Sequence, residues 1–277
     1  MTINRRQALT QIIGISTAAA GATLVGTSAF AATDEAGNYK LELGEKLKYV
    51  PLDAMATAKL AYETPGGCMH QVFHSLITML AQSDSADAAK FASIPTALAG
   101  YGWAGIIGQG TVCGNINATG MLVNILDDLN GQNAAVIGST FRYYENTELP
   151  LSSAEFVAGI GSTPEKTTDE VVTSSVANSI LCHSSISNWS KASGKTFAQK
   201  GERCKRLSAS IAYHLVELLN RAYAGEDLSV LPEAKPSAEA QACQSCHTNG
   251  KVNPPMGTAA SVQADMECTT CHTGHFN

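Results

Sequence analysis

The sequence of 277 residues contains little charge, since Asp, Glu, Lys and Arg together make up only 15% of it. Globular proteins usually reach about a quarter. The formal net charge is −6, and the chain contains no run of lysines and arginines. Because no basic segment is present to neutralise phosphates, a nucleic acid is not an expected partner. Hydrophobic residues reach 44%, which excludes wholesale disorder.

Signatures of the common enzyme classes are also missing. No Ser/His/Asp set, phosphate-binding glycine loop or pair of acid/base carboxylates stands out, so substrate chemistry has no positive support. The alternation of apolar and polar residues that is typical of strands is absent too. The chain does contain eight cysteines and seven histidines. These are few enough to be interpreted one by one.

The first 31 residues are predicted to be an export signal. Arg5 and Arg6 precede an apolar stretch at 12–25 that is rich in Ala and Gly, and Ala-Phe-Ala at 29–31 fits a cleavage site. The stretch is too short and too weakly hydrophobic for a comfortable transmembrane helix. The paired arginines resemble the twin-arginine signal, which generally exports folded proteins. We therefore expect a periplasmic protein without a stable membrane span after cleavage; an uncleaved anchor and an ordinary N-terminal helix are the alternatives.

Residues 32–231 are predicted to form an all-α domain. Apolar residues recur at helical spacing in three segments: 68–82, 112–129 and 201–223. Two further helix starts, with acidic residues in the first turn, are expected at 153–156 and 168–172.

The composition changes at Pro232. Residues 232–277 hold four Pro, three Gly and four Cys, and their large apolar residues are Val252, Met256, Val262, Met266 and Phe276. So few apolar side chains cannot offset the entropy of ordering this tail. We expect a short, irregular segment whose core is supplied by bound groups.

Two patterns in the tail are typical of c-type haem attachment: Cys243-Gln244-Ser245-Cys246-His247 and Cys268-Thr269-Thr270-Cys271-His272. In each, two thiols three residues apart reach the vinyl groups of one porphyrin, and the next histidine reaches its iron. The sequence therefore predicts two covalent haems, with His247 and His272 as proximal axial ligands. A zinc ribbon has similar cysteine spacing, but a histidine directly after each pair favours haem.

Three histidines are candidates for the distal axial ligands. His70 and His74 are four residues apart and share one helix face. His275 is too near His272 in sequence to reach the far side of the same haem, so it would cap the other haem or one in a second subunit. Ligation by two histidines gives closed irons suited to electron transfer, whereas an open position would indicate ligand binding or catalysis.

The remaining cysteines, Cys68, Cys113, Cys182 and Cys204, stand singly and match no short metal-binding motif. From their spacing they are buried thiols or form two structural disulfides. Their order, with Cys-Gly-Asn-Ile-Asn-Ala at 113–118, resembles a redox-active family defined by a Cys, a Cys-Gly-Ala-x-x-Gly segment and two later cysteines.

With the two tail motifs included, residues 50–277 are similar to the split-Soret cytochrome c family of sulfate-reducing bacteria. Two positions depart from the Cys-Gly-Ala-x-x-Gly segment of the redox-active family: Asn115 stands where that family has Ala, and Ala118 where it has Gly. The resemblance implies a periplasmic homodimer with two bis-histidine haems per subunit and an axial histidine donated across the dimer. It also implies a [2Fe–2S] cluster, for which Cys68, Cys113, Cys182 and Cys204 become the ligand candidates.

We therefore expect an electron carrier rather than an enzyme. Its redox partners are expected to be basic, because the chain is acidic and haem propionates add negative charge. The alternatives are a haem- or thiol-dependent redox enzyme that reduces a small substrate, and a zinc-ribbon binding module.

Overall fold

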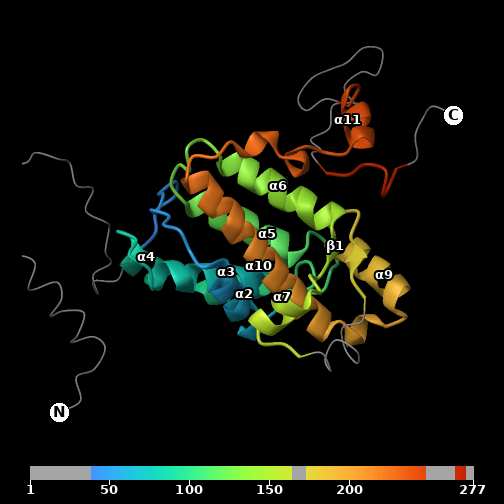
Figure 1. The fold of residues 1–277 in the computed structure, drawn as a ribbon, viewed down its shortest axis with the longest axis horizontal. Helices are drawn as coiled ribbons and strands as arrows, with labels where there is room; N and C mark the ends of the chain where they lie inside the picture. Colours follow the sequence, from blue (N-terminus) through green and yellow to red (C-terminus); the bar gives the residue numbers. More distant parts are fainter. Residues whose placement is uncertain (1–38, 164–172, 248–265, 273–277) are drawn as a thin grey trace, which may run out of the picture.

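The computed structural model describes residues 39–163, 173–247 and 266–272 (Figure 1). The expected signal at 1–31, the expected helix start at 168–172 and the candidate ligand His275 lie outside these ranges.

The described chain is mostly helical, which confirms the all-α prediction. In chain order its elements are α2 (Ala54–Glu63), α3 (Cys68–Ala81), α4 (Ala88–Ser93), η1 (Thr96–Gly102), α5 (Gly114–Ile125), α6 (Asn133–Asn146), β1 (Glu148–Leu149), α7 (Ala154–Gly159), β2 (Ser175–Val176), α9 (Cys182–Ser193), η2 (Phe197–Gln199), α10 (Gly201–Tyr223), η3 (Leu228–Val230), η4 (Pro232–Ala234) and α11 (Ala238–Gln244). The two strands form one short antiparallel sheet, with Glu148 opposite Val176.

Three of the expected helices are present. α3 and α10 coincide with the apolar stripes at 68–82 and 201–223, and α7 begins after Ser153, whose side chain accepts a hydrogen bond from the amide of Phe156. The helix expected over 112–129 is shorter, because α5 covers only Gly114–Ile125. Cys113 and Leu126 flank it in extended conformations, and Leu126 instead forms a bridge with Leu47.

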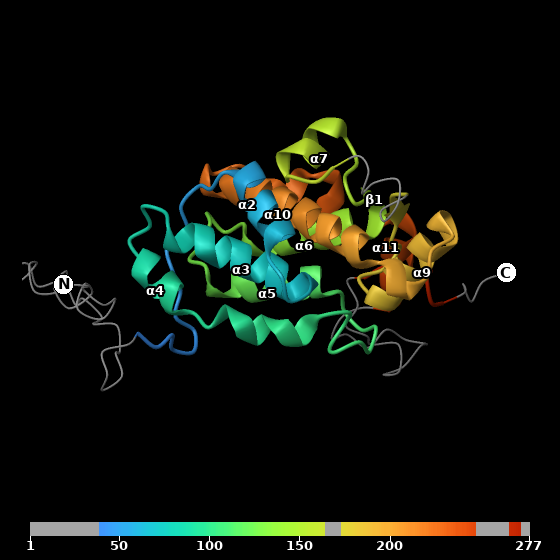
Figure 2. The same cartoon turned by 90° about the horizontal axis from the view of Figure 1, so that it is seen from below.

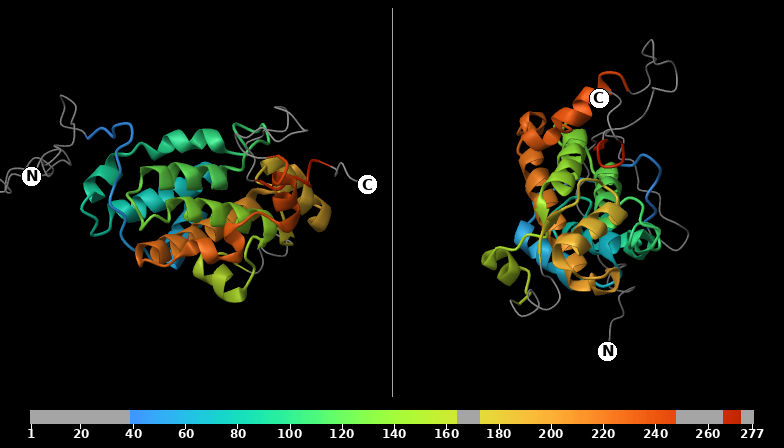
Figure 3. Two further views of the ribbon diagram at one scale, coloured as in Figure 1. Left: turned by 90° about the horizontal axis from the view of Figure 1, so that it is seen from above. Right: turned by 90° about the vertical axis from the view of Figure 1, so that its right-hand side faces the viewer.

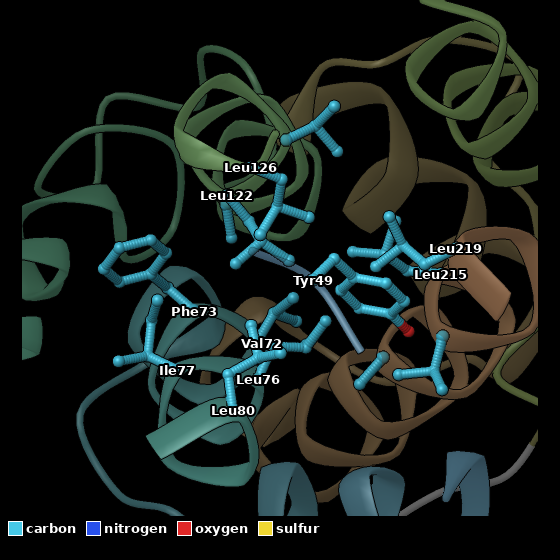
Figure 4. Close-up of a cluster of buried hydrophobic side chains, with 14 of the residues drawn as sticks. Tyr49, Val72, Phe73, Leu76, Ile77, Leu80, Leu122, Leu126, Leu215 and Leu219 are labelled. Atoms are coloured by element: carbon cyan, nitrogen blue, oxygen red, sulfur yellow. The ribbon is translucent and has the colours of Figure 1, made fainter. Parts of the chain in front are cut away.

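The long helix α10 lies at the centre of the domain and packs against α2, α3 and α6 (Figures 1 and 2). The main hydrophobic core lies where α3, α5 and α10 meet, and its side chains include Leu76, Leu122 and Leu215 (Figure 4). The ring of Tyr49 is inserted among them, and its hydroxyl donates a 2.7 Å hydrogen bond to Asn220. Burial of this apolar surface is the main stabilising contribution to the domain.

A second, smaller core contains two of the singly placed cysteines. It is formed by Ala104, Cys113, Ile116, Tyr144, Leu149, Ala177, Cys182, Ile186, Leu207 and Ile211. After α10 the chain passes through η3 and η4, which pack on α6. It then reaches α11, at the end of the molecule opposite α4 (Figures 1 and 3). Among the described helices, none is long and apolar enough to cross a membrane.

Candidate functional site

The four singly placed cysteines line one cavity of about 360 Å³. Each comes from the N-terminal end of a different helix: Cys68 begins α3, Cys113 caps α5, Cys182 begins α9 and Cys204 lies in the first turn of α10. The positive ends of four helix dipoles therefore point toward the same space. Such ends stabilise thiolates over thiols, which suits these positions to metal ligation.

Local backbone geometry brings these cysteines together. The segments before α5 and α9 pair through backbone hydrogen bonds, from Cys113 N to Ile180 O at 2.8 Å and from Cys182 N to Thr111 O at 2.7 Å. Gly67, with φ of 90°, turns the chain into α3 immediately before Cys68. A Cβ atom on Gly114 would lie 2.6 Å from the sulfur of Cys68, so only glycine fits after Cys113.

All eight cysteines lie in described segments, and all carry free thiols. Hydrogen bonding to the Cys113 thiol, followed by burial, raises the pKa of Cys68. Burial and the neighbouring Cys68 and Cys204 raise the pKa of Cys182 to about 12. Burial raises the pKa of Cys204, while the positive charge of Arg203 opposes the change. Metal loading of this cavity must therefore release protons.

No three His, Cys, Asp or Glu side chains in the described segments are close enough together to hold a single metal ion. The donor set is instead four thiols spread around a cavity of about 360 Å³. Four thiolates are the usual ligand set of an iron–sulfur cluster, which spreads its ligands over more than one iron. The residues therefore fit such a cluster in number and in chemistry, and all four line the same cavity.

The cavity wall also contains polar side chains that the sequence did not single out as functional. Tyr144 and Arg203 line it and are almost fully buried, at 1% and 2% exposure. Asn115, the departure from the family pattern, lines it too, and its side-chain amide is hydrogen-bonded to the hydroxyl of Ser208 at 2.9 Å. Tyr144 lies on α6, a helix that the periodicity did not reveal.

Each tail motif forms one helical turn. The carbonyl of Cys243 accepts hydrogen bonds from the amides of Cys246 and His247, at 3.2 and 2.9 Å. The carbonyl of Cys268 does the same with Cys271 and His272, at 3.2 and 3.0 Å. This turn places both thiols of a motif on one side of the backbone, as attachment to one porphyrin requires. The motifs adjoin each other: burial, followed by the neighbouring Cys243 thiol, raises the pKa of Cys268.

The second motif is docked on the helical domain. The amide of Glu267 donates to Glu145 Oε1 on α6, at 3.3 Å. The carboxylate of Glu267 accepts from the amide and the hydroxyl of Ser237, which caps α11, at 3.0 and 2.6 Å. The Thr270 hydroxyl donates to the carbonyl of Asn178. One buried glutamate thus connects both Cys-x-x-Cys-His motifs to α6.

His70 and His74 lie together on α3, as their spacing predicts, with stacked rings whose centroids are 4.9 Å apart. The Nδ1–H of His70 donates to the carbonyl of Pro65 at 2.7 Å. Nδ1 of His74 is hydrogen-bonded to Thr96 at 2.8 Å, and burial followed by the charge of His70 lowers the pKa of His74. These partners belong to the helical domain, and a role for either histidine as a haem ligand stays a prediction.

No family model matches the chain. A curated relative is 28% identical over 234 residues, which is 80% of this chain and 76% of the relative; it is the split-Soret cytochrome c of Desulfovibrio desulfuricans. A solved structure of split-Soret cytochrome c from the same organism, described as containing a novel iron centre, superposes with a TM-score of 0.65 and 25% identity. The superposition covers 82% of this chain and 90% of the chain of the solved structure.

Proposed function

For a chain that is split-Soret cytochrome c-like in sequence and fold, we propose the function of a dihaem electron carrier whose helical domain also holds an iron–sulfur cluster. The observation that carries this proposal is the division of the eight cysteines into two sets. Four lie in helical turns that end in histidine. The other four lie at helix N-termini around one cavity.

The tail supplies the haem ligands. Cys243 and Cys246 would form the thioether bonds of one haem, with His247 on its iron, and Cys268, Cys271 and His272 would do the same for the second. Bound haem supplies an iron that gains and loses one electron reversibly. The thiols of Cys243 and Cys268 are neighbours, so the two motifs lie next to each other, and this placement favours rapid exchange between two haems bound there.

The helical domain would hold the cluster through Cys68, Cys113, Cys182 and Cys204. Such a cluster supplies a second one-electron site. The described chain contributes thiolate-stabilising helix N-termini and the nearby positive charges of Lys200 and Arg203, which lower the cost of deprotonating Cys182 and Cys204. The iron centre of the solved relative supports this assignment.

The docking of the second motif on α6 supports exchange within one chain. Tyr144 lines the cysteine cavity, and the next residue, Glu145, accepts the amide of Glu267, which precedes Cys268. The cavity wall and the second haem-binding motif are therefore joined by a rigid, hydrogen-bonded segment.

Export, assembly and partners complete the proposal. A cluster inserted in the cytoplasm would travel with the folded domain through the twin-arginine route signalled by Arg5 and Arg6, and the tail would receive haem in the periplasm. The protein would act as a homodimer in which a histidine of one subunit caps a haem of the other. Its net charge of −6 favours a basic redox partner.

Haem counting by the pyridine haemochrome method tests the haem assignment. The expected result is two haems per chain, low-spin in both redox states and unchanged by carbon monoxide or cyanide. A high-spin haem that binds these ligands would favour the redox enzyme. A chain purified from a host that matures c-type cytochromes, but without haem, would favour the zinc-ribbon module.

A further inference from the structure

Three arginines of the helical domain are almost fully buried, and they differ in their partners. Arg206 forms an ion pair with Glu202 at 3.1 Å, and Arg142 forms one with Glu145. Arg203, at 2% exposure, has no carboxylate within ion-pair distance in the described part of the chain. A buried guanidinium without a counter-ion is strongly unfavourable, so its position calls for a negative group nearby.

The cysteine cavity supplies the place for that group. Arg203 lines the cavity beside Cys204, the next residue along α10, and its charge acts on the thiols of both Cys182 and Cys204. Its Nη2 atom donates a 2.8 Å hydrogen bond to Ser185, its side chain also contacts the Cys204 thiol, and its buried Nε–H makes no hydrogen bond of good geometry. The bond from Nη2 to Ser185 holds the guanidinium in place, and the Nε–H group can donate to an acceptor bound in the cavity.

Tyr144 approaches the same cavity from α6. Its hydroxyl is buried without a hydrogen bond of good geometry, near the Cys113 thiol, Ser185 and Arg203. Tyr144 and Arg203 therefore converge on Ser185 from two different helices. On the wall that the cysteines share, neither the Tyr144 hydroxyl nor the Nε–H of Arg203 makes a hydrogen bond of good geometry, and the Cys113 and Cys204 thiols lie beside them.

We propose that Arg203 is the counter-ion of the iron–sulfur cluster, and that it and Tyr144 donate hydrogen bonds to the cluster sulfurs. This inference rests on the proposed cluster. A cluster with four thiolate ligands carries a net negative charge, and one-electron reduction adds one more negative charge. A fixed positive charge and fixed donors stabilise the reduced form more than the oxidised form. They act as positioning residues that raise the reduction potential.

The test compares the full-length holoprotein with four variants: Arg203→Gln, Arg203→Lys, Tyr144→Phe and Arg206→Lys. Arg206 is the matched control, since it is buried on the same helix but is paired with Glu202. The midpoint potential is measured by dithionite titration followed by EPR, with non-haem iron and sulfide counted in each sample. Circular dichroism reports whether each variant folds.

We expect Arg203→Gln to lower the equilibrium constant for one-electron reduction of the cluster about tenfold, which is about 59 mV. Tyr144→Phe is expected to shift the potential in the same direction by less, Arg203→Lys to retain most of the wild-type value, and Arg206→Lys to leave it unchanged. An unshifted potential in Arg203→Gln would overturn the proposal.

If Arg203→Gln folds but loses its iron while Arg203→Lys retains it, the counter-ion role is supported through assembly. If both Arg203 variants lose iron, the midpoint potential of the cluster in Tyr144→Phe is the deciding measurement. An unshifted potential in Tyr144→Phe then overturns the proposal. Failure of the proposed function gives a different result, because the wild-type protein itself would then lack sulfide and non-haem iron.

Discussion

Glu145 and Glu267 meet at the junction of the two parts of the chain, where the backbone amide of Glu267 donates to Glu145 Oε1 at 3.3 Å. Both residues are buried. Glu145 follows Tyr144 of the cavity wall, and Glu267 precedes the first cysteine of the second Cys-x-x-Cys-His motif. This contact makes the relative position of the cavity and the haem-binding tail a property of the fold rather than of a free linker.

Replacing Glu267 with Ala tests that junction. The carboxylate holds the N-cap of α11 through the amide and the hydroxyl of Ser237, so its loss removes both bonds. We expect the tail to become several-fold more sensitive to limited proteolysis, since two charge-assisted hydrogen bonds contribute about 1.5–3 kcal/mol each. Glu239→Ala, an exposed glutamate in the first turn of α11, is the control. Equal cleavage rates in the two variants would contradict the role given to Glu267.

Two glycines of α5 provide a matched pair for the cavity. An added Cβ on Gly114 would meet Cys68 Sγ at 2.6 Å and backbone atoms of Gly102 and Met69 at 2.6 and 2.7 Å, whereas one on Gly120 would meet nothing within 4 Å. We expect Gly114→Ala to destabilise the domain by about 1–3 kcal/mol and to lose non-haem iron. Gly120→Ala should stabilise it by about 0.5–1 kcal/mol and keep its iron. Urea unfolding and iron analysis measure both effects, and iron retained in full by Gly114→Ala would count against the cavity as the cluster site.

His214 predicts a pH dependence of stability. It is stacked on Tyr143, with ring centroids 3.7 Å apart, and burial followed by the charge of Arg221 lowers its pKa from 6.5 to about 4. Between these values the unfolded chain binds more protons than the folded one. Stability is therefore fully present above pH 6.5 and is lost as the pH falls toward 4. We expect a loss of about 2 kcal/mol between pH 7 and pH 5 from this residue.

The comparison for this prediction is His214→Phe, which keeps a ring against Tyr143 but cannot titrate. Urea unfolding of both proteins at pH 7 and at pH 5 gives the change in the free energy of unfolding between the two pH values for each protein. The variant should lose less stability on acidification than the parent protein. Equal losses would show that His214 is not buried in its neutral form.

The export route gives a prediction for the signal segment. Changing Arg5 and Arg6 together to Lys keeps the charge but removes the pattern of the twin-arginine signal. We expect the double variant to accumulate in the cytoplasm without haem, as judged by cell fractionation and haem staining. A variant that is exported and matured at the normal rate would argue against this route.

The sequence predicts those features in which one residue type determines the chemistry or the buried face. The two Cys-x-x-Cys-His motifs are recognised from local spacing alone, and each forms the same helical turn. α3 and α10 were predicted because their inward faces are apolar. That the four singly placed cysteines share a site came from a resemblance, because they lie on four separate helices and no spacing connects them.

Two helices that the sequence analysis did not predict, α6 and α9, have polar residues on their buried faces. α6 buries Ser139, Thr140, Arg142 and Glu145, so its apolar periodicity is broken although it is a helix of 14 residues. α9 is rich in Ser and buries only a narrow stripe that includes Cys182 and Trp189. These two helices supply Tyr144 and Ser185. The polar environment of the cavity could therefore not be derived from hydrophobic patterning.

The most direct test of the whole account is metal analysis of the anaerobically purified full-length protein, with EPR of the same sample. Haem iron, non-haem iron and acid-labile sulfide are counted per chain, alongside a variant with Cys113 and Cys182 both changed to Ser. The account predicts low-spin haem together with non-haem iron and sulfide in equal amounts, with the haem retained and the other two lost in the variant. A wild-type protein with a full complement of haem but neither non-haem iron nor sulfide would contradict it.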